Sequence, residues 1–140
     1  MEFITGAHAF RHFQIMSNEL STPRVLLCPA DNDDRSIAAT NFINFNNSNI
    51  SFFVGIVANE SNATMILGGD HNITNGTTLR NGLLDLTTNH PAVWTREIHN
   101  KVGNILLADG SVQQLSISGL QQTVANTGIA TNRIQMPIVR

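Results

Sequence analysis

The sequence predicts an α+β fold in which an N-terminal helix packs on an antiparallel β-sheet. Three observations support this prediction. A stretch over about residues 3–20 has apolar side chains at helical spacing, apolar runs of strand length recur between about residues 24 and 117, and Asp109-Gly110 separates two of these runs. One helix followed by several strands is the pattern of an α+β domain, and 140 residues are enough for a single domain with its own core.

The predicted helix comes first in the chain. Phe3, Ala7, Phe10 and Phe13 recur at near-helical spacing, so they would form one apolar stripe. Ser21-Thr22-Pro23 should end the helix, because the residue before a proline avoids the α region.

The strands are predicted from short runs rich in apolar and β-branched residues. Residues 24–28 are expected to form a short buried strand closed by Pro29. Residues 50–57 give the clearest strand, and strands are also expected at 64–67 and, more weakly, at 83–86. Asn75-Gly76 is a further candidate for a hairpin turn.

A hairpin at Asp109-Gly110 is the strongest local prediction. Asp-Gly favours a two-residue type I′ turn, in which both residues have positive φ. If these are the two turn residues, Leu107 lies opposite Val112. Apolar residues would then lie on both faces of the strand pair, which is typical of a covered sheet.

The last part of the chain is predicted to contain a short helix and a tail. The helix is predicted over residues 120–126, and the tail over residues 127–140. Met136-Pro137 argues against a central strand in that tail, because proline cannot donate a hydrogen bond to a neighbouring strand.

Composition restricts the possible functions. The net charge is −2 and Lys101 is the only lysine, which gives no basic surface for nucleic acid. No apolar run is long enough to span a bilayer, and a single cysteine excludes an intramolecular disulfide. Only 13% of residues are charged, so the surface must consist largely of Asn, Thr, Ser and Gln. Such a surface repels copies of itself only weakly, which is compatible with self-assembly or with an unusual monomer.

Two motifs carry a resemblance to a known family. Cys28-Pro29-Ala30-Asp31 is followed by His99 and, nine residues later, by Asp109-Gly110. In this order they resemble the pseudopilin-like proteins with the H-x9-DG motif, which are prepilin-type and usually labelled as type II secretion proteins. The resemblance covers roughly residues 14–120.

The resemblance implies a pilin-like globular domain and a structural, non-enzymatic role. It implies a subunit of a pilus-like or pseudopilus-like assembly in the cell envelope, periplasmic or extracellular, whose partners are other copies or related pseudopilins. Full-length members of that family begin with a long apolar helix that this sequence does not show. We therefore expect a soluble fragment or a leaderless relative, with no membrane span in this chain.

The motif residues themselves are expected to be structural. With about 3.3 Å per residue along one strand, His99 and Asp109 would lie roughly 30 Å apart, too far for a catalytic pair. The turn explains Asp109. His99 is expected to cap or hydrogen-bond a neighbouring loop, and Cys28 is expected to be a buried structural thiol beside Pro29. No catalytic or cofactor-binding residue is predicted.

Weaker alternatives remain open at this point. His8 and His12 are spaced to share a helix face and could bind zinc or nickel, and with an Asp they could serve a metal-dependent enzyme. The oxygens of residues 31–34, with Asp70 or Asp85, could bind calcium. A structural role is favoured for both groups of residues, so no metal site is predicted.

The alternative function is a secreted or periplasmic module that binds a glycan or a surface partner through residues 41–49 and 72–81. Six glycosylation sequons occur, at Asn46, Asn49, Asn59, Asn62, Asn72 and Asn75, and composition alone explains them.

Overall fold

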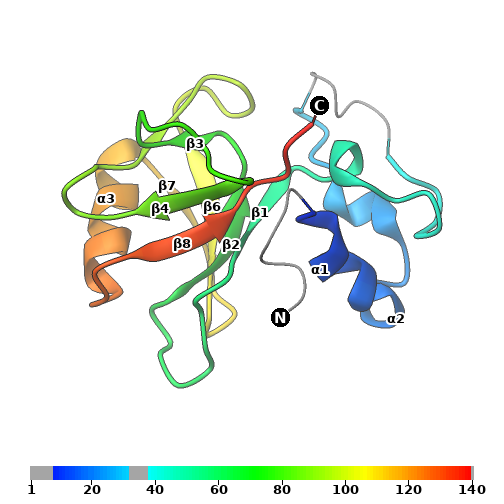
Figure 1. Ribbon diagram of the computed structural model, residues 1–140, viewed down its shortest axis with the longest axis horizontal. Helices are drawn as coiled ribbons and strands as arrows, with labels where there is room; N and C mark the ends of the chain where they lie inside the picture. Colours follow the sequence, from blue (N-terminus) through cyan, green and yellow to red (C-terminus); the bar gives the residue numbers. More distant parts are fainter. Residues whose placement is uncertain (1–7, 32–37, 140) are drawn as a thin grey trace.

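A six-stranded antiparallel sheet forms the centre of the protein, as the computed structural model of residues 8–31 and 38–139 shows (Figure 1). The strand order is β4-β8-β1-β2-β6-β7, and a separate two-stranded ribbon pairs β3 with β5. The strands are β1 Phe52–Gly55, β2 Ile66–Asp70, β3 Ile73–Thr74, β4 Leu83–Leu86, β5 Val93–Trp94, β6 Gly103–Leu107, β7 Val112–Leu115 and β8 Asn132–Gln135. The helices are α1 Phe10–Ile15, α2 Ser17–Leu20 and α3 Ile117–Asn126, with 3-10 helices η1 Pro23–Leu26 and η2 Asn47–Asn49. The α+β class is therefore confirmed.

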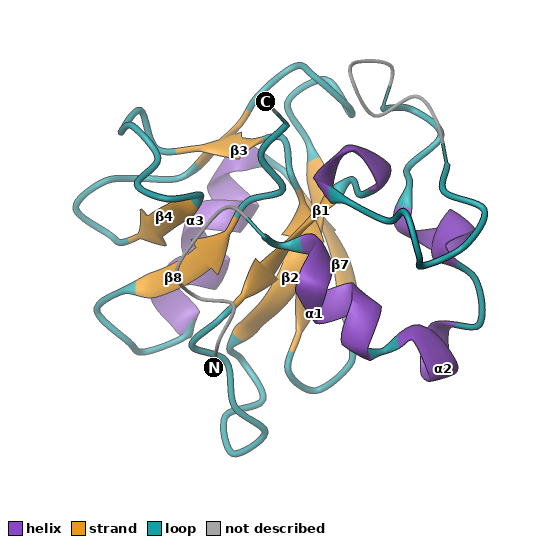
Figure 2. Ribbon diagram, turned by 45° about the vertical axis from the view of Figure 1, so that its right-hand side comes forward, coloured by secondary structure: helices purple, strands orange, loops and turns teal. Residues whose placement is uncertain are grey.

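The main core lies between one face of the sheet and α3 (Figure 2). Phe53 and Ile105 project from β1 and β6 on this face, and Leu120 and Val124 project from α3. The ribbon of β3 and β5 adds Trp94, which is buried against Gly103. The alternation of buried and partly exposed residues along β1, β4 and β6 follows from the two-residue period of a strand with one covered face.

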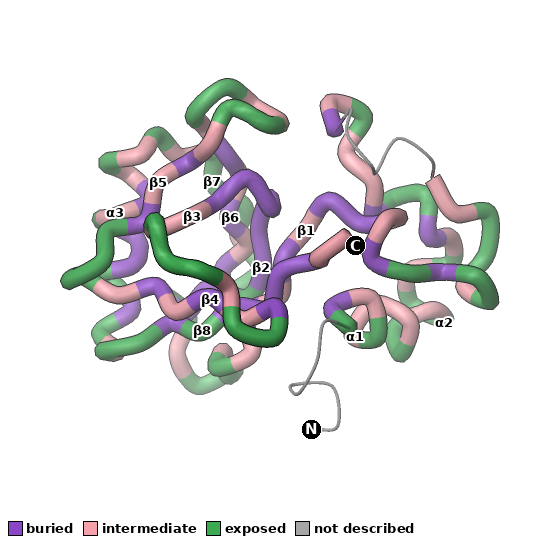
Figure 3. Tube along the Cα trace, turned by 45° about the horizontal axis from the view of Figure 1, so that its top comes forward, coloured by how far each residue is buried: buried purple, intermediate pink, exposed green. Residues whose placement is uncertain are grey.

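A second, smaller core packs the N-terminal helices against residues 26–31 and 38–50. Ala9, Leu26, Phe45 and Ile50 are buried there, and Phe13 is one of the residues packed around them. Figure 3 shows this N-terminal part beside the sheet, with less of its chain buried.

The predicted helix over residues 3–20 is interrupted. Its described part consists of α1 and α2, separated at Met16, and residues 3–7 lie outside the described part of the chain. The predicted strand over residues 24–28 is wrong, because η1 occupies this position. Thr22 accepts a hydrogen bond from Arg24 N, and Pro23 at the first helical position has the φ that a helix requires.

The hairpin is present, but its predicted register is wrong by one residue. Leu106, and not Leu107, lies opposite Val112. Leu107 N donates to Ser111 O, so Ala108, Asp109 and Gly110 form a three-residue loop with positive φ at Gly110 alone. The shift turns Val112 away from the core side, since one residue of slip exchanges the two faces of a strand.

The predicted tail contains an interior strand. β8 pairs with both β4 and β1, so it lies inside the sheet and not at its edge. Met136-Pro137 follows directly after β8 ends at Gln135. The proline therefore limits the length of this strand without removing it.

Other predicted elements are placed nearly as expected. β1, β2 and β4 lie within or close to the predicted runs, and α3 begins three residues earlier than predicted. Gly76 has the positive φ of a turn, but β3 pairs with β5, so Asn75-Gly76 does not join two paired strands. Within the described residues, no helix has the length and apolar character needed to cross a membrane.

Candidate functional site

The Cys-Pro-x-Asp element forms a tight turn at the junction of the two cores. Asp31 N donates to Cys28 O at 3.0 Å, and Pro29 occupies the second turn position, where its fixed φ is favourable. The turn directs the Asp31 side chain inward, where it is only 3% exposed.

Asp31 connects three segments of the chain. Its Oδ2 accepts a hydrogen bond from Ser51 Oγ at 2.8 Å and lies 2.7 Å from His71 Nε2. Ser51 Oγ in turn accepts a hydrogen bond from Cys28 N at 2.9 Å. Because Asp31 and His71 are both buried, this pair replaces the water that each group loses on folding.

His99 joins the same junction from the segment before β6. Its Nε2 lies 3.6 Å from Cys28 Sγ and 3.5 Å from Asp70 Oδ2. Asp70 is buried at the end of β2, and its Oδ2 also accepts two hydrogen bonds from Asn104, from N at 2.7 Å and from Nδ2 at 2.9 Å. We call these residues the junction cluster: Cys28, Asp31, Ser51, Asp70, His71, His99 and Asn104.

Asn72 fixes the loop that carries His99. It is fully buried, and its Nδ2 donates to Thr95 O and Val102 O on either side of that loop. Asn100 and Lys101 have positive φ, which reverses the chain directly after His99. A glycan at the Asn72 sequon is incompatible with this burial.

The junction cluster contains the residue types of a Cys-His-Asp catalytic triad but not its geometry. In a triad, the thiol and the carboxylate contact different ring nitrogens of the histidine. Here Cys28 Sγ and Asp70 Oδ2 both approach Nε2 of His99. One ring nitrogen cannot both accept a proton from the thiol and donate one to the carboxylate, so the relay of a triad is not formed here. The arrangement favours a structural role.

The two halves of the H-x9-DG pattern serve different places. His99 belongs to the junction cluster, whereas Asp109 lies in the exposed hairpin loop. Asp109 Oδ1 accepts hydrogen bonds from Ser111 N and Oγ, and these bonds hold the pKa of this carboxyl below its usual value. Cys28, Asp31 and His99 converge, while Asp109 and Gly110 form the turn.

Sequence reasoning misses three members of the cluster, Ser51, His71 and Asn104. It considers Asp70 as a possible calcium ligand and as part of a segment that resembles the pseudopilin-like family, but not as a partner of His99. The polar run Asp70-His71-Asn72 at the end of a strand is the available signal, since polar residues that follow a buried strand need partners.

The other candidate metal ligands make different contacts in the structure. α1 begins at Phe10, so His8 lies before the helix, where its ring packs against Phe10. His12 Nε2 instead lies 2.7 Å from Gln135 Oε1. Residues 32–34 of the candidate calcium loop lie outside the described residues. Among residues 8–31 and 38–139, no group of three or more His, Cys, Asp or Glu side chains is arranged to hold a metal ion.

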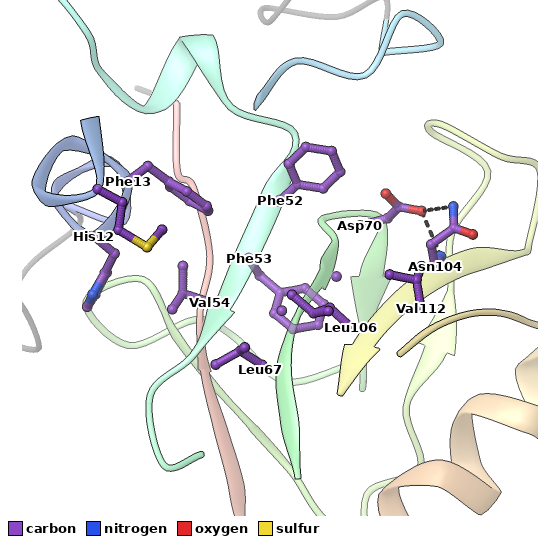
Figure 4. Close-up of a pocket in the computed structure, with 13 residues that line it drawn as sticks. His12, Phe13, Phe52, Phe53, Val54, Leu67, Asp70, Asn104, Leu106 and Val112 are labelled. Carbon is purple, nitrogen blue, oxygen red and sulfur yellow. Dashed lines mark hydrogen bonds between the residues drawn. The ribbon is translucent and has the colours of Figure 1, made fainter. Parts of the chain in front are cut away.

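A second candidate site is an apolar groove of about 480 Å³ on the face of the sheet opposite α3. Val54, Gly68, Leu106 and Val112 lie in one row across four strands, because the register pairs each with the next. Figure 4 shows His12 and Phe13 of α1 on one side of the groove and the strand residues on the other. Its full lining is His12, Phe13, Met16, Phe52, Phe53, Val54, Leu67, Gly68, Gly69, Asp70, Asn104, Leu106 and Val112.

Several apolar side chains of the groove are exposed to solvent. Val112 is 66% exposed, Met16 41% and Leu67 40%. Apolar side chains that gather around one concave surface are typical of an interaction site.

Comparison with known proteins gives no relative. No family model matches the chain, and no curated protein or solved structure matches it.

Proposed function

We propose that the protein is a structural, non-enzymatic subunit of a pseudopilus-like assembly of the cell envelope, acting by self-association. The observation that carries this proposal is the largely apolar open face of the sheet together with its uncharged edge at β7. The groove opens on this face, and β7 ends the sheet beside it.

The β7 edge lacks the features that usually prevent strands from pairing between molecules. Its sequence, Val-Gln-Gln-Leu, has neither charge nor proline, and its first three residues are exposed. Among the described strands, β7 pairs only with β6. Soluble proteins commonly protect such edges with charged side chains, prolines or bulges, so this edge favours pairing with a second copy.

The resemblance to pseudopilin-like proteins supports the same proposal. The junction cluster provides a structural use for Cys28, Asp31 and His99, so that these motif residues do not require a catalytic explanation. The position of α1 beside the sheet would correspond to the N-terminal helix of a pilin-like domain. The proposed location is periplasmic or extracellular, as in the family.

Light scattering over a range of concentrations, with negative-stain microscopy, tests this proposal. We expect the mass to rise above the 15.3 kDa of one chain as concentration increases. Gln113→Lys adds a charge to the β7 edge and should reduce this rise, whereas Gln122→Lys on the exposed side of α3 should not. A mass of one chain at every concentration would reject self-association.

A polar concavity favours the second candidate, a binding module. It has a volume of about 720 Å³ and is lined by residues of the 75–81 segment together with Asp85 and Arg133. Arg80 and Arg133 against Asp85 leave a positive balance, which suits an acidic oligosaccharide.

A thermal-shift titration distinguishes this candidate. Oligogalacturonate should raise the melting temperature saturably in the wild type and less in Arg80→Ala, with Arg96→Ala as the exposed control outside the concavity. If oligogalacturonate did not shift the melting temperature, the binding-module hypothesis would be rejected.

A further inference from the structure

The sheet edge at β7 presents its backbone hydrogen-bonding groups in a defined pattern. Along an antiparallel strand, successive residues point both backbone groups alternately at one neighbour and at the other. Leu107 N donates to Ser111 O across the hairpin, so Ser111 and Gln113 direct their backbone groups toward β6. The N–H and C=O groups of Val112 and Gln114 therefore point out of the sheet.

The partner strand confirms this alternation. Asn104 lies opposite Gln114, and its N donates to Asp70 Oδ2 on the β2 side, away from β7. Residues 112–114 are all exposed. Because β7 is the last strand of the sheet, no strand of residues 8–31 and 38–139 covers its outward groups.

The opposite edge of the sheet, at β4, is covered by the chain itself. Arg80 N donates to Leu83 O at 3.2 Å, and Leu83 N donates to Arg80 O at 2.9 Å. Asn75 Nδ2 donates to Asp85 O at 2.8 Å. The β4 edge is therefore not available to the β7 edge of another copy, which leaves β7 itself as the matching edge.

We propose that β7 of one copy pairs antiparallel with β7 of a second copy about a two-fold axis at Gln113. This inference rests on the proposed self-association and names a contact for it. When Gln113 lies opposite its own counterpart, Val112 of each copy lies opposite Gln114 of the other. All the outward groups of these residues then form hydrogen bonds, two in each Val112–Gln114 pair.

Other two-fold registers use fewer of these groups. An axis at Val112 would place Gln114 opposite the hairpin loop, and an axis at Gln114 would place Val112 opposite Ser116, the N-cap of α3. Gln113 is also uncharged, as a residue on the axis should be, because a charged side chain there would face the same charge on the other copy.

The pairing joins two sheets of six strands into one continuous sheet. The two-fold axis is perpendicular to the sheet, so both apolar grooves open on the same side of it. Because both copies use the same edge, this contact closes at two chains.

Disulfide trapping locates the axis. In a Cys28→Ser background, which removes the only native thiol, Gln113→Cys should form a two-chain disulfide with oxidised glutathione. On the axis, the two Cα atoms lie about 4.5 Å apart, within the range that a disulfide spans. Val112→Cys and Gln114→Cys are the matched controls. Each would lie roughly 8 Å from its counterpart and should crosslink at least about tenfold more slowly.

A proline on the same edge tests the hydrogen bonds. Gln114→Pro removes an outward N–H from each copy but none of the bonds to β6, and edge strands tolerate proline at such positions. It should weaken pairing by roughly ten- to a hundredfold in light scattering, because two hydrogen bonds are lost. Gln114→Val keeps the N–H and should pair as the wild type does. Circular dichroism and thermal melting would establish that the variants are folded.

The outcomes for the two proposals are distinguishable. If the wild type associates but Gln113→Cys crosslinks no faster than the two controls, or Gln114→Pro pairs as tightly as Gln114→Val, the β7 contact is overturned and self-association stands. A wild type of one chain at every concentration would overturn both proposals.

Discussion

Gly110 adopts a backbone conformation that other residues rarely adopt. Its φ is +86°, and a Cβ built at this position would meet no other atom within 4 Å. A substitution there is therefore strained by the backbone alone, without a steric clash. We predict that Gly110→Ala lowers the free energy of unfolding by about 1 kcal/mol and that β-branched Gly110→Val lowers it further, as measured by urea denaturation.

Gly119 provides the matched control for this prediction. It lies inside α3, where a Cβ would make ordinary contacts with Leu115 and Ser116. Gly119→Ala should raise stability by roughly 0.5–1 kcal/mol, because alanine favours the helix. If Gly110→Ala were as stable as the wild type, the positive φ of the hairpin loop would be wrong.

The hairpin shows what a dipeptide can predict and what it cannot. Asp109-Gly110 correctly indicates a turn, and Gly110 has the positive φ that the pattern requires. The predicted register is wrong because Asp109 Oδ1 binds Ser111 N, which favours a loop of three residues and not two. The difference depends on a side-chain contact after the turn, which the pattern of apolar residues does not contain.

At the scale of elements, Arg133 on β8 and Asp85 on β4 form the clearest electrostatic pair. They lie directly opposite each other, and Arg133 donates from Nε to Asp85 Oδ1 at 2.7 Å and from Nη2 to Asp85 Oδ2 at 2.9 Å. These hydrogen bonds, with the positive charge of Arg133, hold the pKa of the Asp85 carboxyl below its usual value. Both side chains are nearly half exposed, so the pair should contribute at most about 1 kcal/mol.

The lowered pKa of Asp85 fixes the direction of the pH dependence. The unfolded chain binds the Asp85 proton at a higher pH than the folded chain does. The contribution to stability is therefore complete above the unfolded pKa of about 3.9 and is lost as the pH falls through the folded pKa. We predict that Arg133→Gln lowers the free energy of unfolding near neutral pH and that this difference shrinks in acid. Urea denaturation across pH measures it.

Asp85→Asn serves as the control background. There, the effect of Arg133→Gln should no longer depend on pH, because the titrating carboxyl is absent. A pH-dependent difference that persists in Asp85→Asn would assign the effect to another group.

Interior strand β8 is the least predictable element. It contains few apolar residues, since Asn132 and Gln135 are buried polar residues and Arg133 is exposed. The strand is stabilised by pairing with β4 and β1, which lie far away in sequence. By contrast, β1 is predictable because its own residues are apolar and β-forming. Strand pairing of this long-range kind is absent from local patterns.

At the scale of the whole molecule, polar contacts join the N-terminal core to the sheet. Asp31 binds Ser51 and His71, His12 lies against Gln135, and Asn47 Nδ2 donates to Ile138 O. The sequence predicts that Cys28, Asp31 and His99 are structural, but not that they meet. Asp31 and His71 are 40 positions apart, and His12 and Gln135 are 123 apart, so only the folded chain brings these partners together.

Asp31→Ala tests whether the junction cluster holds the two cores together. The substitution leaves His71 and Ser51 buried without their shared acceptor, and loss of one partner of a buried pair costs about 3–5 kcal/mol. Because the main core is formed by the sheet and α3, its own packing should remain. We predict faster hydrogen exchange in residues 8–31 and 38–50, with protection retained at Phe53 and Ile105.

Glu60→Ala, in an exposed loop, is the control for Asp31→Ala and should leave the exchange pattern unchanged. Loss of protection to the same extent in both cores of Asp31→Ala would contradict the prediction, because it would mean that the two cores unfold as one cooperative unit. Selective loss of protection in the N-terminal part would instead show that the Cys-Pro-x-Asp turn holds the N-terminal core against the sheet. By holding α1 beside the open face of the sheet, it would maintain one wall of the apolar groove.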